Sequence, residues 1–222
     1  LMGKPGLKTA EQLKGGTVAI SRFGSATDSI ARFALKKIGL TPGKDVTIVQ
    51  VGSGPARLDA ALTGKVSAAV INPPSSFLAE RRGLAVVADV AQMGLVFQHT
   101  GAATTKRFIR EHQDVVRRYV KSHVEAVHRI WTDKEATVKA LGKYMGGGVE
   151  RDILEKSRDN ILTEALLPKK QYPTLEGLKT VLEDVGDRDP RAKTAKPEQF
   201  VDFSFIKELD QSGYIDGLYK KK

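Results

Sequence analysis

Short apolar runs alternate with segments of helical period over the first 90 residues. Four runs rich in β-branched residues lie at 17–21, 46–51, 67–72 and 85–90. Runs of this kind are typical of strands that are buried on both faces of a sheet. Strands that alternate with helices in this way predict a mainly parallel α/β unit with right-handed crossovers.

The helical segments between these runs each have one apolar face and stop at a glycine. The first segment has an apolar face made of Ile30, Phe33, Ala34 and Ile38. It is expected to end at Gly39, and the next two helices at Gly64 and Gly83. Glycine is a common helix stop because it adopts the left-handed conformation without strain.

The pattern changes after about residue 95. A strand or two is expected within 96–108, and long helical segments follow at 112–131, 133–145, 150–165, 174–185 and 197–212. Amphipathic helices of this kind need a partner surface for their apolar faces. Few strands remain to supply a sheet, so the second half lacks part of a core of its own.

Composition is that of an ordinary globular protein. Of the 222 residues, 41% are hydrophobic, 28% are charged and 6% are aromatic, and a chain of this length forms one large domain or two small ones. No apolar run approaches the ~20 residues that a membrane-spanning helix needs. The first 16 residues lack the apolar core of a signal peptide, so any export signal is expected to lie outside this chain.

Charge narrows the classes of partner. The net charge is +10, which by itself fits nucleic acid, an anionic membrane surface or solubility alone. Lysine and arginine alternate with acidic residues along the helices, and the one dense basic run is 219–222. No aromatic and basic stripe or recognition motif accompanies them. No nucleic-acid partner is therefore expected.

Small and hydroxyl residues gather where three predicted strands give way to helices. They are Ser25 and Thr27 in the first turn, Gly52, Ser53 and Gly54 in the second, and Asn72, Ser75 and Ser76 in the third. Ligands bind at this edge of an open parallel sheet, because helix N–H groups and positive dipole ends point outward there. The first turn is the best candidate for holding an anionic group. The alternative is that these residues only cap their helices.

Several kinds of site are excluded or disfavoured. The first turn lacks the G-x-G-x-x-G fingerprint and the lysine of a phosphate-binding loop, so no nucleotide cofactor is expected. The absence of cysteine excludes thiol catalysis, disulfides and cysteine-bound metal. His123 and His128 lie five positions apart, about 140° around a helix, so they cannot share a metal ion. No metal site and no catalytic residues are predicted.

An ordered series of motifs resembles a known family over nearly the whole chain. The motifs are LKGGTVAIS (13–21), GSATD (24–28), GLTPGKDV (39–46), ARLDAALTGKVSAAVINPP (56–74), VFQHTGAATTKRFI (96–109), HQDVVRRYVKSHVEAVHRIW (112–131), YPTLEGLKTVLEDV (172–185) and PEQFVDFSFIKELDQSG (197–213). Together they resemble the periplasmic substrate-binding proteins of ABC importers. Within that family, the similarity is to the nitrate, sulfonate, taurine and thiamine-pyrimidine-precursor group.

This resemblance implies a type II periplasmic binding protein fold, with two α/β lobes and a hinge of two crossing strands. On that template, residues 15–92 form the complete second lobe, and residues 1–14 and 93–222 form the rest of the first lobe with the C-terminal helices. The hinge is expected near 10–16 and 90–96. The first lobe lacks its opening strands, so apolar surface is expected to be exposed or covered by self-association with a second copy.

The resemblance also implies a set of ligand-binding residues in the turns and the return segment. They are Ser21, Arg22, Phe23, Gly24, Ser25, Thr27, Gly52, Ser53, Asn72, Pro73, His99 and Thr100. Arg22 and Phe23 lie where side-chain identity is expected to set specificity. A guanidinium at Arg22 can pair bidentately with a sulfonate, a carboxylate or a phosphate, whereas the alternative for this residue is a solvated surface arginine.

The implied function is binding, without catalysis or a cofactor. An extracytoplasmic protein of this family, periplasmic or lipid-anchored, captures a small organic anion or a pyrimidine precursor and delivers it to the membrane subunits of an ABC importer. One alternative is an enzyme similar to the pyrimidine synthases of this group, although those depend on a cysteine-rich segment. The other is the effector-binding lobe of a transcription regulator.

Overall fold

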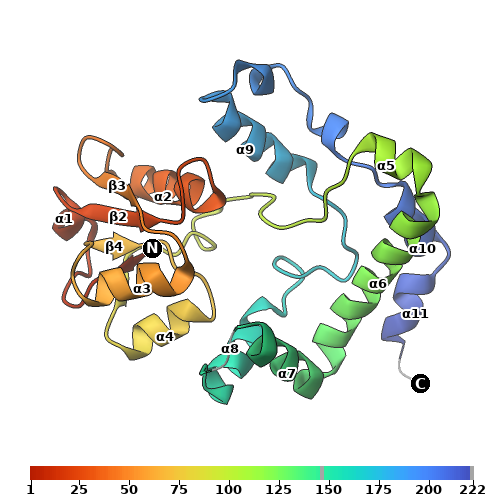
Figure 1. Cartoon of the computed structure of the whole chain (residues 1–222), viewed down its shortest axis with the longest axis horizontal. Coiled ribbons are helices and arrows are strands. Elements are labelled where there is room, and N and C mark those ends of the chain that lie inside the picture. The colour runs from red at the N-terminus through yellow and green to blue at the C-terminus, as the bar shows by residue number, and fades with distance from the viewer. Residues whose placement is uncertain (146–147, 221–222) are drawn as a thin grey trace. The chain divides into compact units, whose positions relative to one another are not determined.

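The computed structural model describes residues 1–145 and 148–220. The chain forms two compact units, Leu1–Val96 and Phe97–Lys222, which are coloured red to yellow and green to blue in Figure 1. The fold is mixed α/β, as predicted. All strands of the described residues lie in the first unit, and the described part of the second unit consists of helices and loops.

One five-stranded sheet forms the centre of the first unit. Its strands are β1 (Met2–Gly3), β2 (Thr17–Ile20), β3 (Thr47–Gln50), β4 (Ala68–Ala69) and β5 (Ala85–Val86), in the order β3-β2-β4-β1-β5. β2 pairs in parallel with β3 and with β4. β1 is antiparallel to both of its neighbours, β4 and β5.

Helices cover both faces of this sheet, as the alternation along β2 requires. The helices are α1 (Ala10–Leu13), α2 (Ala26–Lys37), α3 (Gly54–Leu62) and α4 (Ser75–Arg81). Val18 and Ile20 are fully buried in one core with Leu35 of α2, whereas Ala19 between them packs in a second core with Leu58 of α3. Successive side chains of a strand point to opposite faces, and α2 accordingly lies on the other side of the strands from α3 and α4 (Figure 1).

The buried face of α2 differs from the predicted one by about one position. Ala31, Ala34 and Leu35 are fully buried, while Phe33 is only partly buried, outside the core, and its ring lies 5.5 Å from the Lys37 ammonium. The alanines leave room for α2 to approach the sheet closely, which turns Phe33 outward. The predicted C-terminal end of α2 is confirmed, since Gly39, which follows the helix, has a left-handed φ of 80°.

Two boundary predictions are wrong. Residues 1–14 do not belong with the second half, because β1 lies inside the sheet of the first unit, with Met2 opposite both Ala69 and Val86. The expected hinge segment 10–16 instead contains α1, and Leu13 is fully buried in the core. The segments that run side by side are 1–3 and 85–88, where Val87 N–H donates to the Leu1 carbonyl at 2.9 Å. A two-residue strand leaves no periodic signal, which is why the sequence did not show it.

Seven α-helices and two short 3₁₀ turns make up the described part of the second unit. They are α5 (Lys106–Glu111), α6 (Gln113–Thr132), α7 (Lys134–Tyr144), α8 (Arg151–Ile161), α9 (Leu175–Gly186), η1 (Pro190–Lys193), η2 (Pro197–Phe200), α10 (Ser204–Gln211) and α11 (Tyr214–Tyr219). The strand expected within 96–108 is absent from this part of the chain, and the helix expected over 197–212 is divided into η2 and α10.

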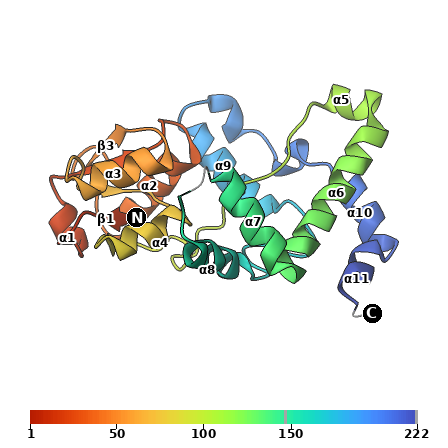
Figure 2. The ribbon, with the colours of Figure 1, turned by 60° about the horizontal axis from the view of Figure 1, so that its bottom comes forward.

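The second unit has a small core between α6, α10 and α11, which lie side by side in Figures 1 and 2. Its fully and nearly fully buried side chains are Val124, Ile206, Leu209 and Ile215. The buried guanidinium of Arg158 donates to the carbonyls of Ile130 and Trp131, and so satisfies the C-terminal end of α6. Among the residues that the structure describes, no helix combines the length and apolar character needed to cross a membrane.

The contrast between Leu35 and Phe33 gives a test of the first core. Leu35→Ala should lower the free energy of unfolding by about 3 kcal/mol, because it removes a fully buried side chain and leaves a cavity. Phe33→Ala on the same helix should cost about 1 kcal/mol or less, because the ring is outside the core. Urea denaturation followed by circular dichroism measures both, and equal losses would contradict the assigned face.

Candidate functional site

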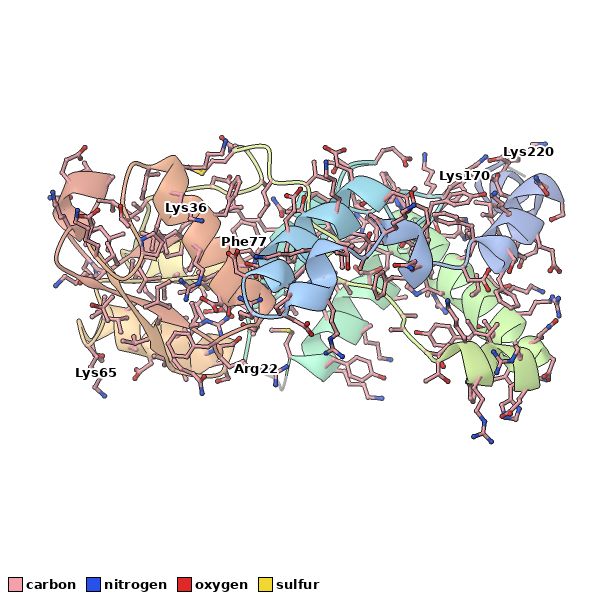
Figure 3. All side chains as sticks on the ribbon, turned by 90° about the horizontal axis from the view of Figure 1, so that it is seen from above. Arg22, Lys36, Lys65, Phe77, Lys170 and Lys220 are labelled. Carbon is pink, nitrogen blue, oxygen red and sulfur yellow. The ribbon has the colours of Figure 1, made fainter. Side chains whose placement is uncertain are left out.

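Three turns of the first unit meet at one edge of the sheet. Because β3, β2 and β4 run parallel, the turns that follow them lie side by side, and α2, α3 and α4 begin there. Figure 3 shows this arrangement: Arg22, after β2, and Phe77, in α4, lie at one end of the unit, and Lys65, before β4, lies at the other. The positive ends of the helix dipoles therefore converge on the edge that the sequence predicts.

A triangle of hydroxyl groups occupies the first turn. The distance from Ser21 Oγ to Ser25 Oγ is 2.9 Å, from Ser21 Oγ to Thr27 Oγ1 2.9 Å, and from Ser25 Oγ to Thr27 Oγ1 3.0 Å. Ser25 Oγ also donates to the Arg22 carbonyl at 2.7 Å, and Thr27 Oγ1 accepts from Ser21 N–H at 2.9 Å. We name this group the hydroxyl triangle. All three of its members are residues that the sequence nominated.

The hydroxyl triangle has more contacts than protons. Each hydroxyl supplies one proton, so the three groups supply three protons for the three contacts between them and the fourth contact to the Arg22 carbonyl. At any moment one contact is therefore unsatisfied. All three protons are therefore already in use, so an oxygen acceptor that arrives from outside takes one only by replacing an internal contact. A charged acceptor favours that exchange, because hydrogen bonds to charged groups are stronger than neutral ones.

Only part of the main chain of the first turn is available to a ligand. Gly24 N–H donates to Asp28 Oδ2 at 2.8 Å, and Ser25 N–H donates to the Arg22 carbonyl at 3.3 Å. Within the described residues, the N–H groups of Ala26 and Thr27 have no hydrogen-bond partner. Two free amides at the N-terminus of a 12-residue helix form a natural site for negative charge.

The side chain of Ser25 does not cap α2, contrary to the alternative that these residues only cap their helices. Ser25 occupies the N-cap position of α2, but its hydroxyl accepts no hydrogen bond from a backbone N–H of the first turn of the helix in the described structure. Ser53 behaves differently, because its Oγ accepts from Ala56 N–H at 3.3 Å and caps α3. The hydroxyl of Ser25 therefore belongs to the turn, and that of Ser53 belongs to the helix.

Asp28 fixes the shape of the first turn from behind. Its carboxylate is almost completely buried and binds both Gly24 N–H and, at 2.8 Å, the Nε of Arg32. The pairing with Arg32 compensates the negative charge, which would otherwise oppose an anion at the start of α2. The bond to Gly24 depends on the conformation of the turn, which the sequence alone does not show.

The second and third turns expose fewer donors. Gly52 has a φ of 103°, a conformation that favours glycine. Asn72 is exposed, and its side-chain amide lies 3.4 Å from the Pro73 carbonyl. Pro73 and Pro74 are joined by a cis peptide bond. Gly54 and Ser75, from different turns, are neighbours, since a Cβ at Gly54 would lie 3.8 Å from Ser75 Oγ.

Sequence reasoning missed Arg57, which links two of these turns. It lies on α3 and is only 4% exposed. Its Nε donates to the Val70 carbonyl at 2.8 Å, and its Nη1 donates to the Gly52 carbonyl. One sequence signal could have revealed it. Arg57 lies beside the apolar Leu58 on a short predicted helix and only a few residues after the second predicted binding turn.

The remaining nominated residues lie at the rim or in the second unit. Arg22 and Phe23 are exposed, Phe23 to 56%, and Phe23 N–H donates to Gln50 Oε1 at 3.2 Å. His99 and Thr100 belong to an exposed segment of the second unit, where the Thr100 carbonyl accepts from Gln98 Nε2. Their part in the site stays a prediction.

Metal chemistry finds no support in the described residues. No group of three or more histidine, cysteine, aspartate or glutamate side chains there is arranged to hold an ion. His123 stacks with Tyr119, and His128 meets the edge of Tyr219 at a ring distance of 4.9 Å. These two histidines take part in aromatic contacts on α6.

Replacing Asp28 tests whether its carboxylate holds the first turn. Asp28→Asn should lower the free energy of unfolding by about 2 kcal/mol, because the amide cannot accept from both Gly24 N–H and Arg32 Nε. Asp59→Asn, on the exposed face of α3, is the matched control and should change stability by less than about 0.5 kcal/mol. Urea denaturation at neutral pH compares the two, and equal stability of both variants would show that the turn does not need this carboxylate.

The chain is similar to binding proteins of ABC importers. A curated sequence of Brachyspira hyodysenteriae, named as an ABC transporter periplasmic binding protein, is 24% identical over 167 residues, which cover 75% of this chain and 47% of that one. The chain thus spans about half the length of this relative.

Solved structures show the same fold. The alkanesulfonate-binding protein SsuA of Xanthomonas axonopodis pv. citri, bound to MOPS, has a TM-score of 0.66 at 20% identity, over 88% of this chain and 65% of that one. The periplasmic aliphatic sulphonate binding protein SsuA of Escherichia coli has a TM-score of 0.65 at 18% identity, over 92% and 69%. The predicted periplasmic binding protein fold is therefore confirmed.

A family model connects these similarities to the sequence itself. The model described as the NMT1-like family matches residues 4–145, which include β2 to β5, all three turns and Arg57. The match covers more than half of the chain and contains every residue of the candidate site. The chain belongs to the NMT1-like family.

Proposed function

We propose that this protein is the substrate-binding component of an ABC importer and that its first turn binds the anionic group of a small sulfonate. The observation that carries this proposal is the hydroxyl triangle beside two free helix amides, with O–O distances of 2.9 to 3.0 Å. The named functions of the relatives in Brachyspira, Xanthomonas and Escherichia support the same class of protein.

A sulfonate suits the donors of the first turn. Its three oxygens share a permanent negative charge, and the turn offers hydroxyl protons from Ser21, Ser25 and Thr27 together with the amides of Ala26 and Thr27. Hydrogen bonds to a charged acceptor contribute more than neutral ones. The exposed ring of Phe23 and the guanidinium of Arg22 at the rim then contact the organic part of the ligand or a second charged group.

The other nominated residues complete the proposed site. Gly24 and Gly52 allow the turns to bend, Ser53 and Asn72 contribute an amide donor each, and Pro73 shapes the third turn. His99 and Thr100, in the second unit, stay ligand contacts predicted from the family resemblance. Taurine is itself a sulfonate and fits the proposal, whereas a nitrate-like ion or a pyrimidine precursor at this site would correct the ligand class and leave the binding function in place.

The proposed function also implies where the protein acts and which partner it meets. A substrate-binding component acts outside the cytoplasm, in the periplasm or on a lipid anchor, and delivers its ligand to the importer's membrane subunits. It carries out no reaction on the ligand. Self-association through exposed apolar surface of the second unit remains a prediction, which light scattering on the purified chain can measure.

A thermal-shift screen identifies the ligand class. Methanesulfonate, butanesulfonate, taurine, MOPS, nitrate, bicarbonate and an aminopyrimidine are added separately to the purified protein. A ligand present at 100 times its dissociation constant adds about 2.7 kcal/mol to the stability of the folded state. We expect the sulfonates to raise the melting temperature most. Stabilisation by none of these compounds would contradict the proposed function.

Substitutions in the hydroxyl triangle test the site itself. Ser25→Ala and Thr27→Val should each weaken binding of the best sulfonate about tenfold, because each removes a donor to a charged acceptor worth roughly 1.5 to 3 kcal/mol. Thr27→Ser keeps the hydroxyl and should retain most of the affinity. Isothermal titration calorimetry gives the dissociation constants.

Thr63→Ala is the matched control, because Thr63 lies at the C-terminal end of α3, where its hydroxyl donates to the Asp59 carbonyl. It should leave sulfonate affinity unchanged. Should Ser25→Ala and Thr27→Val bind as tightly as the unaltered protein, the hydroxyl triangle would be a structural feature of the turn only.

A further inference from the structure

Arg57 reaches across the end of the central strand. Its two bonded carbonyls belong to Gly52, in the turn after β3, and Val70, in the turn after β4. These two strands are not neighbours, because β2 lies between them. The guanidinium therefore spans the end of β2, directly behind the point where Ser21 begins the first turn.

The bond to Gly52 sets the direction of a neighbouring amide. The carbonyl of Gly52 and the N–H of Ser53 belong to one planar trans peptide unit and point in opposite directions. Since the Gly52 carbonyl points toward the buried Arg57, the Ser53 N–H points away from it. Within residues 1–145 and 148–220, that N–H has no hydrogen-bond partner. Gly52 has a φ of 103°, which lets the peptide adopt this orientation.

The charge on Arg57 is not balanced by an acid. Within the described residues no carboxylate pairs with it, and its guanidinium donates to the two carbonyls alone. Burial lowers the pKa of its guanidinium, but an arginine side chain keeps its proton in proteins. A buried cation without a counter-charge is costly. An anion bound at the adjacent edge would supply the missing counter-charge.

We infer that Arg57 is a positioning residue for anion binding, which directs the Ser53 amide toward the ligand and places a permanent positive charge behind the hydroxyl triangle. This inference rests on the proposed function and adds a residue that never needs to touch the ligand. A purely structural tie between the two turns would explain the hydrogen bonds but would make no use of the charge.

Three variants distinguish the effect of the positive charge of Arg57 from the effect of its hydrogen bonds to the two carbonyls. Arg57→Met removes both the charge and the hydrogen bonds. Arg57→Lys keeps the charge but cannot reproduce the planar fork that joins two carbonyls. Lys65→Met removes one positive charge from the opposite end of the unit (Figure 3) and is the control. Calorimetry with methanesulfonate and with inorganic sulfate measures affinity. NMR measures the hydrogen exchange of the Ser53 amide in protein saturated with methanesulfonate, where a bound sulfonate oxygen accepts from that amide and slows its exchange.

The two roles predict different patterns. Arg57→Met should bind methanesulfonate at least about tenfold more weakly, a loss of about 1.4 kcal/mol, and its Ser53 amide should exchange several-fold faster. Arg57→Lys should recover part of the affinity, while fast exchange at Ser53 persists. Lys65→Met should match the unaltered protein in both measurements.

Contrary results fall into distinct classes. An Arg57→Met protein that melts earlier but binds methanesulfonate normally would reduce Arg57 to a structural tie and overturn the inference alone. If Arg57→Met does not fold, Arg57→Lys decides: unchanged affinity together with unchanged Ser53 exchange overturns the inference. Failure of the unaltered protein to bind either methanesulfonate or sulfate would overturn the proposed function, and this inference with it.

Discussion

The parallel pairing of β2 with β3 and β4 is the constraint on which the candidate site depends. Parallel strands end at the same edge, so their pairing brings together three turns, each about 20 to 30 residues from the next along the chain. Each turn then begins a helix, which adds its N–H groups to that edge. Without this pairing, the first turn, with its hydroxyl triangle and free amides, would have no fixed relation to Arg57 of α3 or to the turns that Arg57 joins.

Much of the first unit could be predicted because its signals are local. The runs that became β2 and β3 are continuous apolar stretches, and Gly39 marks a helix end through a backbone conformation that few other residues adopt. β1 could not be predicted, because its position depends on pairing with strands more than 60 residues away and not on its own two residues. The orientation of Phe33 depended on how closely the alanines of α2 let the helix approach the sheet.

The candidate site shows the same division. Ser25 and Thr27 were found from their residue type and their place at a predicted helix start, since hydroxyl groups there suggest anion binding, and Ser21 was added by the family resemblance. The contacts that determine how these hydroxyl groups act could not be predicted from the sequence. The use of Gly24 N–H by Asp28 and the crossing of β2 by Arg57 are tertiary contacts. In the second unit, helical period predicted α6 to α9 but gave no sign that Tyr119, Tyr144 and Phe200 would be among its exposed large apolar side chains.

The pairing of β1 with β5 also determines how the first unit connects to anything beyond it. Leu1 and Ala88 are joined by a hydrogen bond from the Leu1 nitrogen to the Ala88 carbonyl at 2.6 Å, so the chain enters and leaves this fold through adjacent backbone segments. A fold with its two ends side by side can be inserted into a host chain at a single point.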